Sequence, residues 1–287
     1  MAQAAPIESL IAVIPDSKSG PDVYVNVEPL ISQKGVPFAS GASLMGQSAA
    51  AAAATVPVAF QIYSMQSTFL RAVNAKEKVY YHVERTMDKQ AFCARVRNEE
   101  KGRNVLEYHV PMSHIGGIQP DGISDEKLQQ VMGANLTRSV PLLRVDAKEE
   151  PFQWRPLDSP RGVEPTKFWE RSFVRSPALV SRNPHLHQSA LAWLSDTYTL
   201  GTPLDANPSK VGKQMRNVTM GATLTNNISL HEPTANVDER MLGERVTSWG
   251  DNGRAIIHQR FWDVKNGRLI LSGTQEIVVR LRNANKL

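Results

Sequence analysis

The distribution of apolar residues predicts two buried helices. Residues 41–56 read Gly-Ala-Ser-Leu-Met-Gly-Gln-Ser, followed by six alanines, Thr and Val. Alanine has the highest helix propensity, and a helix that is apolar on every side is a buried one. The second helix is predicted over 186–200, where Leu186, Ala190, Trp193 and Leu194 recur at helical spacing. Gly201 and Pro203 are expected to end it.

Strand-like segments follow each helix in the same order. Runs rich in β-branched and aromatic residues, separated by turn residues, predict antiparallel strands. The segments are 58–69, 79–86, 91–98 and 105–110 after the first helix, and 219–230, 240–247, 255–263 and 269–281 after the second. A repeated order of this kind indicates an internal duplication.

We therefore expect an α+β chain built as a pseudo-dimer. Each unit has a central helix wrapped by an antiparallel sheet, and the two sheets join edge to edge, which hides edge strands. Residues 1–112 are predicted to form the first unit with an N-terminal extension, which includes an edge strand at 23–27. Residues 113–165, rich in Pro and Gly, are predicted as a linker with a short helix at 125–132, and 166–287 as the second unit.

Composition narrows the functional classes. Of the 287 residues, 41% are hydrophobic and 21% charged, as in ordinary globular proteins. No apolar run is long enough to span a membrane, and no secretory signal is evident. The net charge is +5, but Lys and Arg are scattered and no basic-aromatic repeat suggests nucleic-acid binding. A polyanionic small molecule such as coenzyme A is compatible with this charge.

The residues that usually carry covalent or metal chemistry are poorly placed. There is no Gly-x-Ser-x-Gly motif, and the single cysteine, Cys93, lies inside a predicted strand. His185 and His187 are two residues apart on a helix and so face different directions, which gives no metal site. We expect neither a metal nor a cofactor.

One cysteine fits an intracellular protein, and Asn285-Lys286-Leu287 resembles the Ser-Lys-Leu type of peroxisomal signal.

Asp196 is the unusual residue of the second helix. It lies at the edge of the buried face, three residues after Trp193. A carboxylate there is costly unless it is solvated, hydrogen-bonded or used in a reaction. The pattern alone leaves open whether Asp196 bonds nearby backbone groups or belongs to a functional site.

Five segments, taken together, resemble one family. They are Gly-Gln-Ser-Ala-Ala at 46–50, Ser-Thr-Phe-Leu-Arg at 67–71, Ala-Phe-Cys-Ala-Arg-Val at 91–96, Leu-Ala-Trp-Leu-Ser-Asp at 191–196, and Gln-Glu at 275–276. Their order and spacing are similar to those of the acyl-CoA thioesterase II family. The resemblance covers roughly 40–110 and 185–281 and implies a double hot-dog fold and hydrolysis of acyl-CoA thioesters. It also implies further assembly into a homo-oligomer.

The family's water-activating residues map onto Asp196, Thr223 and Gln275. The resemblance and the predicted helix start imply that Gly41 and Gly46 offer backbone N–H groups to the thioester, and Asn226 is included as a substrate-binding residue. The family has Asp-His where this chain has Thr225-Asn226. That departure leaves two alternatives open: a related enzyme that hydrates, cyclises or transfers a specialised acyl or polyketide thioester, and a non-catalytic acyl-CoA binding protein.

Overall fold

The computed structural model describes residues 4–32, 36–84, 112, 150–157 and 159–282. Their largest element is a seven-stranded antiparallel sheet of order β3-β7-β10-β9-β8-β6-β5. Its strands are β3 (Ser64–Thr68), β7 (Val218–Leu230), β10 (Leu269–Leu281), β9 (Arg254–Asp263), β8 (Met241–Asp251), β6 (Trp169–Arg175) and β5 (Gln153–Pro156). A smaller sheet has the order β1-β2-β4, with β1 at Val13–Pro15, β2 at Val23–Asn26 and β4 at Tyr80–His82.

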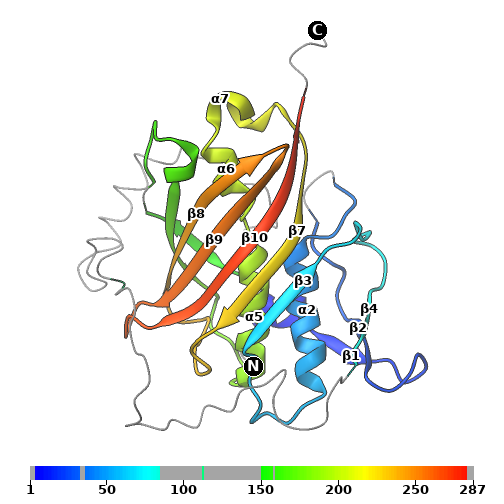
Figure 1. The fold of residues 1–287 in the computed structure, drawn as a ribbon. Helices are drawn as coiled ribbons and strands as arrows, with labels where there is room; N and C mark the ends of the chain where they lie inside the picture. Colours follow the sequence, from blue (N-terminus) through cyan, green and yellow to red (C-terminus); the bar gives the residue numbers. More distant parts are fainter. Residues whose placement is uncertain (1–3, 33–35, 85–111, 113–149, 158, 283–287) are drawn as a thin grey trace.

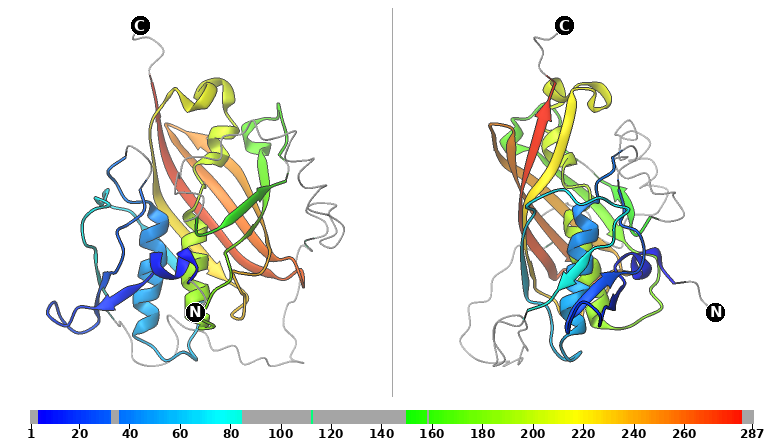
Figure 2. Two further views of the ribbon diagram at one scale, coloured as in Figure 1. Left: turned by 180° about the vertical axis from the view of Figure 1, so that it is seen from behind. Right: turned by 90° about the vertical axis from the view of Figure 1, so that its right-hand side faces the viewer.

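Two helices lie side by side against one face of the large sheet (Figures 1 and 2). They are α2 (Gly41–Ala54) and α5 (Pro184–Asp196). Both begin with a side-chain cap, since Ser40 accepts from the Ala42 N–H and Asn183 from the His185 N–H. The short helices are α1 (Pro6–Leu10), η2 (Pro165–Lys167), α6 (Gly201–Asp205), α7 (Pro208–Val211) and η3 (Lys213–Met215).

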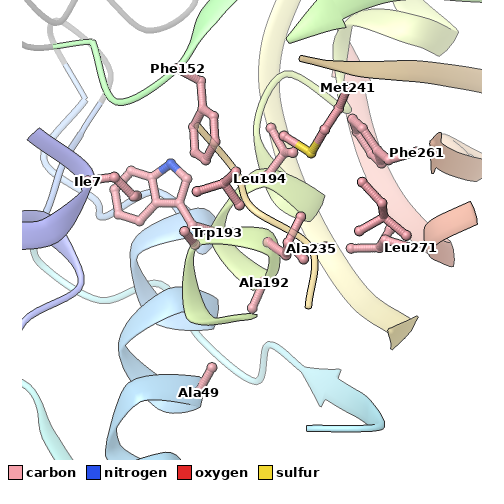
Figure 3. Packing of buried hydrophobic residues seen from close by; sticks show 14 of the residues in the cluster. Ile7, Ala49, Phe152, Ala192, Trp193, Leu194, Ala235, Met241, Phe261 and Leu271 are labelled. Atoms are coloured by element: carbon pink, nitrogen blue, oxygen red, sulfur yellow. The ribbon is translucent and has the colours of Figure 1, made fainter. Parts of the chain in front are cut away.

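The core fills the space between the helices and the sheet (Figure 3). Trp193 is 1% exposed, and Met241, Phe261 and Leu271 reach the same cluster from the sheet. Gly46 marks a tight contact between the helices, because a Cβ there would lie 3.2 Å from the Trp193 Cβ and 2.8 Å from Ile11 Cγ2. The small residues of α2 therefore allow the close approach of its neighbours.

Most of the predicted elements in the described residues are present. Both central helices form, and the four strands of the second half correspond to β7, β8, β9 and β10. The two halves also share one sheet, because β3 of the first half pairs with β7 of the second. The predicted strands at 91–98 and 105–110 and the short helix at 125–132 lie outside the described residues.

Four expectations were wrong in detail. The second helix ends at Asp196, and Pro203 lies in the first turn of α6, where a missing N–H costs nothing. The expected edge strand, β2, is the middle strand of its sheet and is buried throughout. The predicted strand at 58–69 is strand only over β3. Strand β5 lies within the predicted linker and pairs with β6, which was not predicted; the domain boundaries remain a prediction.

Candidate active site

Asp196 is bound by the two residues predicted to work with it. Its Oδ1 accepts a hydrogen bond from Thr223 Oγ1 at 2.9 Å and another from Gln275 Nε2 at 2.6 Å. Gln275 Nε2 also donates to Thr223 Oγ1 at 2.8 Å, which closes the triangle. Gln275 is fully buried and Asp196 is 9% exposed. The structure therefore brings together the three residues expected to be catalytic.

A β-bulge places Thr223 on the inner face of the sheet. Along a regular strand, Thr223 and Asn226 would face opposite sides, because side chains alternate with a period of two. In β7, however, Asn226 pairs with Gln275 and Thr223 with Ile277, so that Leu224 is an extra residue. Residues opposite each other share a face, and Thr223 therefore lies on the same side as Gln275.

The first half of the chain contributes the start of α2. Gly41 is the first residue of this helix, and a Cβ on it would overlap Asp196 Oδ2. The Ala42 backbone N–H, in the same turn, is shared between Ser40 Oγ and the Asp196 carboxylate. Only a glycine at position 41 lets the helix N-terminus approach the carboxylate this closely.

The environment holds the carboxyl of Asp196 near neutrality. Burial raises its pKa from 3.8 to about 7, because removal from water disfavours the charged form. The hydrogen bonds from Thr223, Gln275 and Ala42 and the positive charge of Arg245 oppose this rise in pKa. A carboxylate with such a pKa is suited to take a proton from water at physiological pH.

A cavity of ≈ 410 Å³ opens beside this group. Gly41, Asp196 and Thr223 line part of it, and Arg71 and Tyr198 are its other titratable wall residues. Most of the remaining wall is apolar, formed by Val36, Phe38, Ala39, Leu44, Phe69, Leu70, Ala72, Val73, Leu200, Met220, Ala222, Leu224 and Val278. The cavity thus joins a reactive polar end to a surface that suits a hydrocarbon chain.

Two of the predicted substrate-binding residues lie elsewhere. Gly46 is in the middle of α2 and faces Ile11 and Trp193 in the core, so its role is packing. Asn226 is fully buried, is absent from the cavity wall, and donates from Nδ2 to Ser195 Oγ at 3.1 Å. Gly41 is the one of the three that reaches the cavity.

Sequence reasoning missed Arg245 and Tyr198. Arg245 is 5% exposed on β8 and its charge acts on Asp196. Tyr198, two residues after Asp196, has a positive φ of 60°, which is unusual for an aromatic residue. The sequence held no signal for Arg245, because its burial follows from the packing of β8, in which Gly243, two residues earlier, pairs with the core residue Phe261.

Comparison with known proteins agrees with this geometry. Residues 32–110 match the model of the acyl-CoA thioesterase N-terminal domain, and residues 119–279 match that of the C-terminal domain. The chain belongs to the acyl-CoA thioesterase family. The sequence-based assignment to an acyl-CoA thioesterase of this family is thereby confirmed.

Curated relatives in this family match along most of their length. Acyl-coenzyme A thioesterase 8 of Mus musculus is 29% identical over 267 residues, covering 84% of this chain and 80% of the relative. The Homo sapiens protein of the same name is 28% identical with the same coverage.

Solved structures confirm the double hot-dog fold expected for the thioesterase. The acyl-CoA thioesterase II TesB2 from Mycobacterium marinum superimposes with a TM-score of 0.67 at 20% identity, covering 96% of this chain and 99% of that one. A hot-dog protein of unknown function from Alicyclobacillus acidocaldarius gives a TM-score of 0.60 at 13% identity, with coverages of 97% and 99%. No helix in the described ranges of the chain has the length and hydropathy needed to cross a membrane.

Proposed function

We propose that this acyl-CoA thioesterase hydrolyses its substrate with a water molecule activated by Asp196, Thr223 and Gln275. One observation carries the proposal: a buried carboxyl with a pKa near 7 is hydrogen-bonded to both partners in the wall of a largely apolar cavity. A free acid and coenzyme A are the products.

The chemistry requires a base and donors for the oxyanion. Asp196 accepts a proton as the water oxygen attacks the thioester carbonyl carbon. Thr223, on the cavity wall, holds the water, and Gln275, which does not line the cavity, holds Asp196 and Thr223 in position. The carbonyl oxygen, which becomes negative, faces the N-terminus of α2 at Gly41, where the helix dipole and backbone N–H groups favour an anion. The C–S bond then breaks, and the sulfur leaves with the proton.

The test is release of the coenzyme A thiol from a panel of acyl-CoA esters of different chain lengths. We expect hydrolysis by the wild-type protein, and we expect Asp196→Asn to lower kcat by at least about 100-fold, the scale of a general base. The variant keeps the shape of the side chain, so that circular dichroism should match the wild type. Equal rates for both proteins on the best substrate would remove Asp196 from the mechanism.

The departure at Thr225-Asn226 motivated a different reaction on a specialised thioester. The position of Asn226, behind the site and bonded to Ser195, lends that alternative no support. Product analysis by mass spectrometry separates the possibilities. A cyclised, hydrated or transferred product without free acid would indicate the alternative reaction, and binding without any turnover would indicate an acyl-CoA binding protein.

We also propose peroxisomal import and self-association for this chain. Import rests on Asn285-Lys286-Leu287, which lies outside the described residues. Fluorescent fusions with and without these three residues test it, and equal distributions of the two fusions would contradict it.

Self-association rests on the family resemblance, and light scattering of the purified protein measures it directly.

A further inference from the structure

Arg245 is buried behind the active site, on strand β8. Its side chain is 5% exposed, and its guanidinium lies 5.2 Å from the ring centre of Trp154 and 5.6 Å from that of Phe261. Its Nη2 lies 3.5 Å from the carbonyl oxygen of Leu194, in the last turn of α5. The cation thus stands at the end of the helix that carries Asp196, where the helix dipole favours a positive charge.

This arginine has few partners for a buried charge. Within the described part of the chain, no carboxylate lies within ion-pair distance of its guanidinium, and its Nε has no hydrogen bond. Burial of a charge without a partner in contact is costly. Two aromatic faces and one long hydrogen bond offset only part of that cost. A function that needs the charge would explain why the site retains it.

Two carboxyl groups, those of Glu170 and Asp196, favour the charged form of Arg245, and Arg245 in turn favours the charged form of Asp196. Glu170, on β6, accepts a hydrogen bond from Thr202 Oγ1 at 2.6 Å. Burial lowers the pKa of Arg245 to about 10, which still leaves it protonated at neutral pH.

The other elements around Asp196 contribute little charge. Strand β7 supplies Thr223, β10 supplies Gln275, and the first turn of α2 supplies no charged side chain. On the cavity wall, Arg71 and Tyr198 are the titratable groups, and Tyr198 is hydrogen-bonded to Glu150. Arg245 is therefore the buried cation in the described surroundings of the catalytic carboxyl.

We propose that Arg245 is a positioning residue for hydrolysis, a buried positive charge that acts through Asp196 and favours its ionised form at neutral pH. The inference rests on the proposed role of Asp196 as the base. Arg245 does not line the cavity, and so it has no contact with substrate. Its effect is on the fraction of enzyme molecules in which Asp196 can accept a proton.

The experiment compares three variants by their pH–rate profiles. Arg245→Met removes the charge and keeps an apolar stem between the two rings, and Arg245→Lys keeps a charge. Glu170→Gln removes a neighbouring carboxylate and leaves the cation beside Asp196 in place, so it serves as the control. On the acidic side of the profile kcat falls as Asp196 is protonated, and we call this part of the curve the acidic limb. We expect its midpoint to lie near pH 7 in the wild type and about one pH unit higher in Arg245→Met. At pH 7 this lowers kcat about fivefold, with recovery near pH 9 and an unchanged KM.

The acidic limbs of wild type, Arg245→Lys and Glu170→Gln are expected to lie together, and that of Arg245→Met at higher pH. A purely structural role would lower kcat or the folded fraction at every pH and leave the limb in place, and that result would overturn the proposal. If Arg245→Met does not fold, Arg245→Gln takes its place, since it also removes the charge, and an unmoved limb in that variant would contradict the proposal.

A second readout separates this inference from the proposed function. The titration of Asp196 is followed by NMR of protein labelled with ¹³C-carboxyl aspartate, and the resonance is assigned by its loss in Asp196→Asn. A higher midpoint in Arg245→Met supports the inference, and an equal midpoint overturns it, whether or not acyl-CoA is hydrolysed. Failure of the wild type to hydrolyse any acyl-CoA would instead count against the proposed function alone.

Discussion

The groups around Asp196 have opposing effects on the ionisation of its carboxyl. Removal from water favours its neutral form, whereas three hydrogen-bond donors and the charge of Arg245 favour the anion. Hydrogen bonds to a charged carboxylate are stronger than those to a neutral carboxyl, so these donors stabilise the ionised form of Asp196. The cost of keeping a carboxylate in this position is a loss of stability that the rest of the fold must offset.

This cost makes stability depend on pH in a definite direction. The pKa of Asp196 is about 7 in the folded protein and near 3.8 when unfolded, so the folded protein holds the proton more tightly. The contribution of Asp196 to the free energy of unfolding therefore falls as pH rises from about 4 to about 7, by an amount on the order of a few kcal/mol.

Asp196→Asn removes this titration. We expect the free energy of unfolding of the variant, minus that of the wild type, to increase as pH rises from about 4 to about 8. Urea unfolding of both proteins across that range measures this difference. Other titrating groups cancel in the difference. A difference that is constant with pH would show that the pKa of Asp196 is not raised by folding.

At the scale of elements, α2 carries two glycines with separate roles. Gly41 faces the carboxylate, whereas Gly46 faces the core. In Gly41→Ala the methyl group would overlap Asp196 Oδ2 and lie 3.2 Å from Phe69 Cζ. We expect kcat to fall by about 100-fold, since displacement of a reacting group by about 1 Å has an effect of this size.

Gly46→Ala is the matched control on the same helix. Its methyl group meets Ile11 and Trp193, and we expect a loss of about 1–3 kcal/mol in the free energy of unfolding. Its kcat per folded molecule should stay near that of wild type. Thermal unfolding and thiol release are measured on both variants. Loss of kcat in Gly46→Ala with loss of stability alone in Gly41→Ala would contradict the separate roles of the two glycines.

The sequence predicted the helices and strands better than the points where they end or change register. Helix α5 and strands β7 and β10 follow from apolar spacing and β-branched composition, and the motifs they carry identified Asp196, Thr223 and Gln275. Thr223 on the inner face depends on the bulge at Leu224, which simple alternation does not reveal. The end of α5 depends on the extended backbone of Thr197, and Tyr198 then has a positive φ, a conformation that sequence rarely indicates for an aromatic residue.

Strand β6 and Arg245 show a second limit. Residues 169–175 include charged side chains and follow a proline-rich stretch, so their pattern gave little sign of a strand between β5 and β8. Arg245 on a predicted strand looks like a solvent-facing residue. Both faces of β8 are buried around Arg245, where Leu242 is 5% and Glu244 6% exposed, and burial on both faces arises only when the neighbouring elements pack.

At the scale of the whole molecule, net charge should affect substrate capture. The chain carries +5, and coenzyme A is a polyanion. Exposed charges are screened beyond about 10 Å at 0.1 M salt, so salt should weaken the attraction. We expect KM for an acyl-CoA to rise several-fold between about 0.05 M and about 0.5 M salt, with kcat little changed.

The control is the same acyl group on N-acetylcysteamine, which lacks the phosphates. Its KM should depend little on salt, because only the thioester end remains. Steady-state kinetics on the two substrates at each salt concentration provide the comparison. A KM that rises equally for both substrates would place the effect of salt on the protein fold or on the acyl group.

The assembly of the site from distant parts of the chain bears on how the protein is made. The hydrogen bond between Gln275 and Asp196 spans 79 positions, and the helix start that faces the carboxylate comes from the other half of the chain. During synthesis, α5 leaves the ribosome before β7 and β10 exist, so Asp196 must remain hydrated until the last strand of the sheet arrives. The enzyme is therefore inactive until the sheet is complete, and turnover is itself a measure of finished folding.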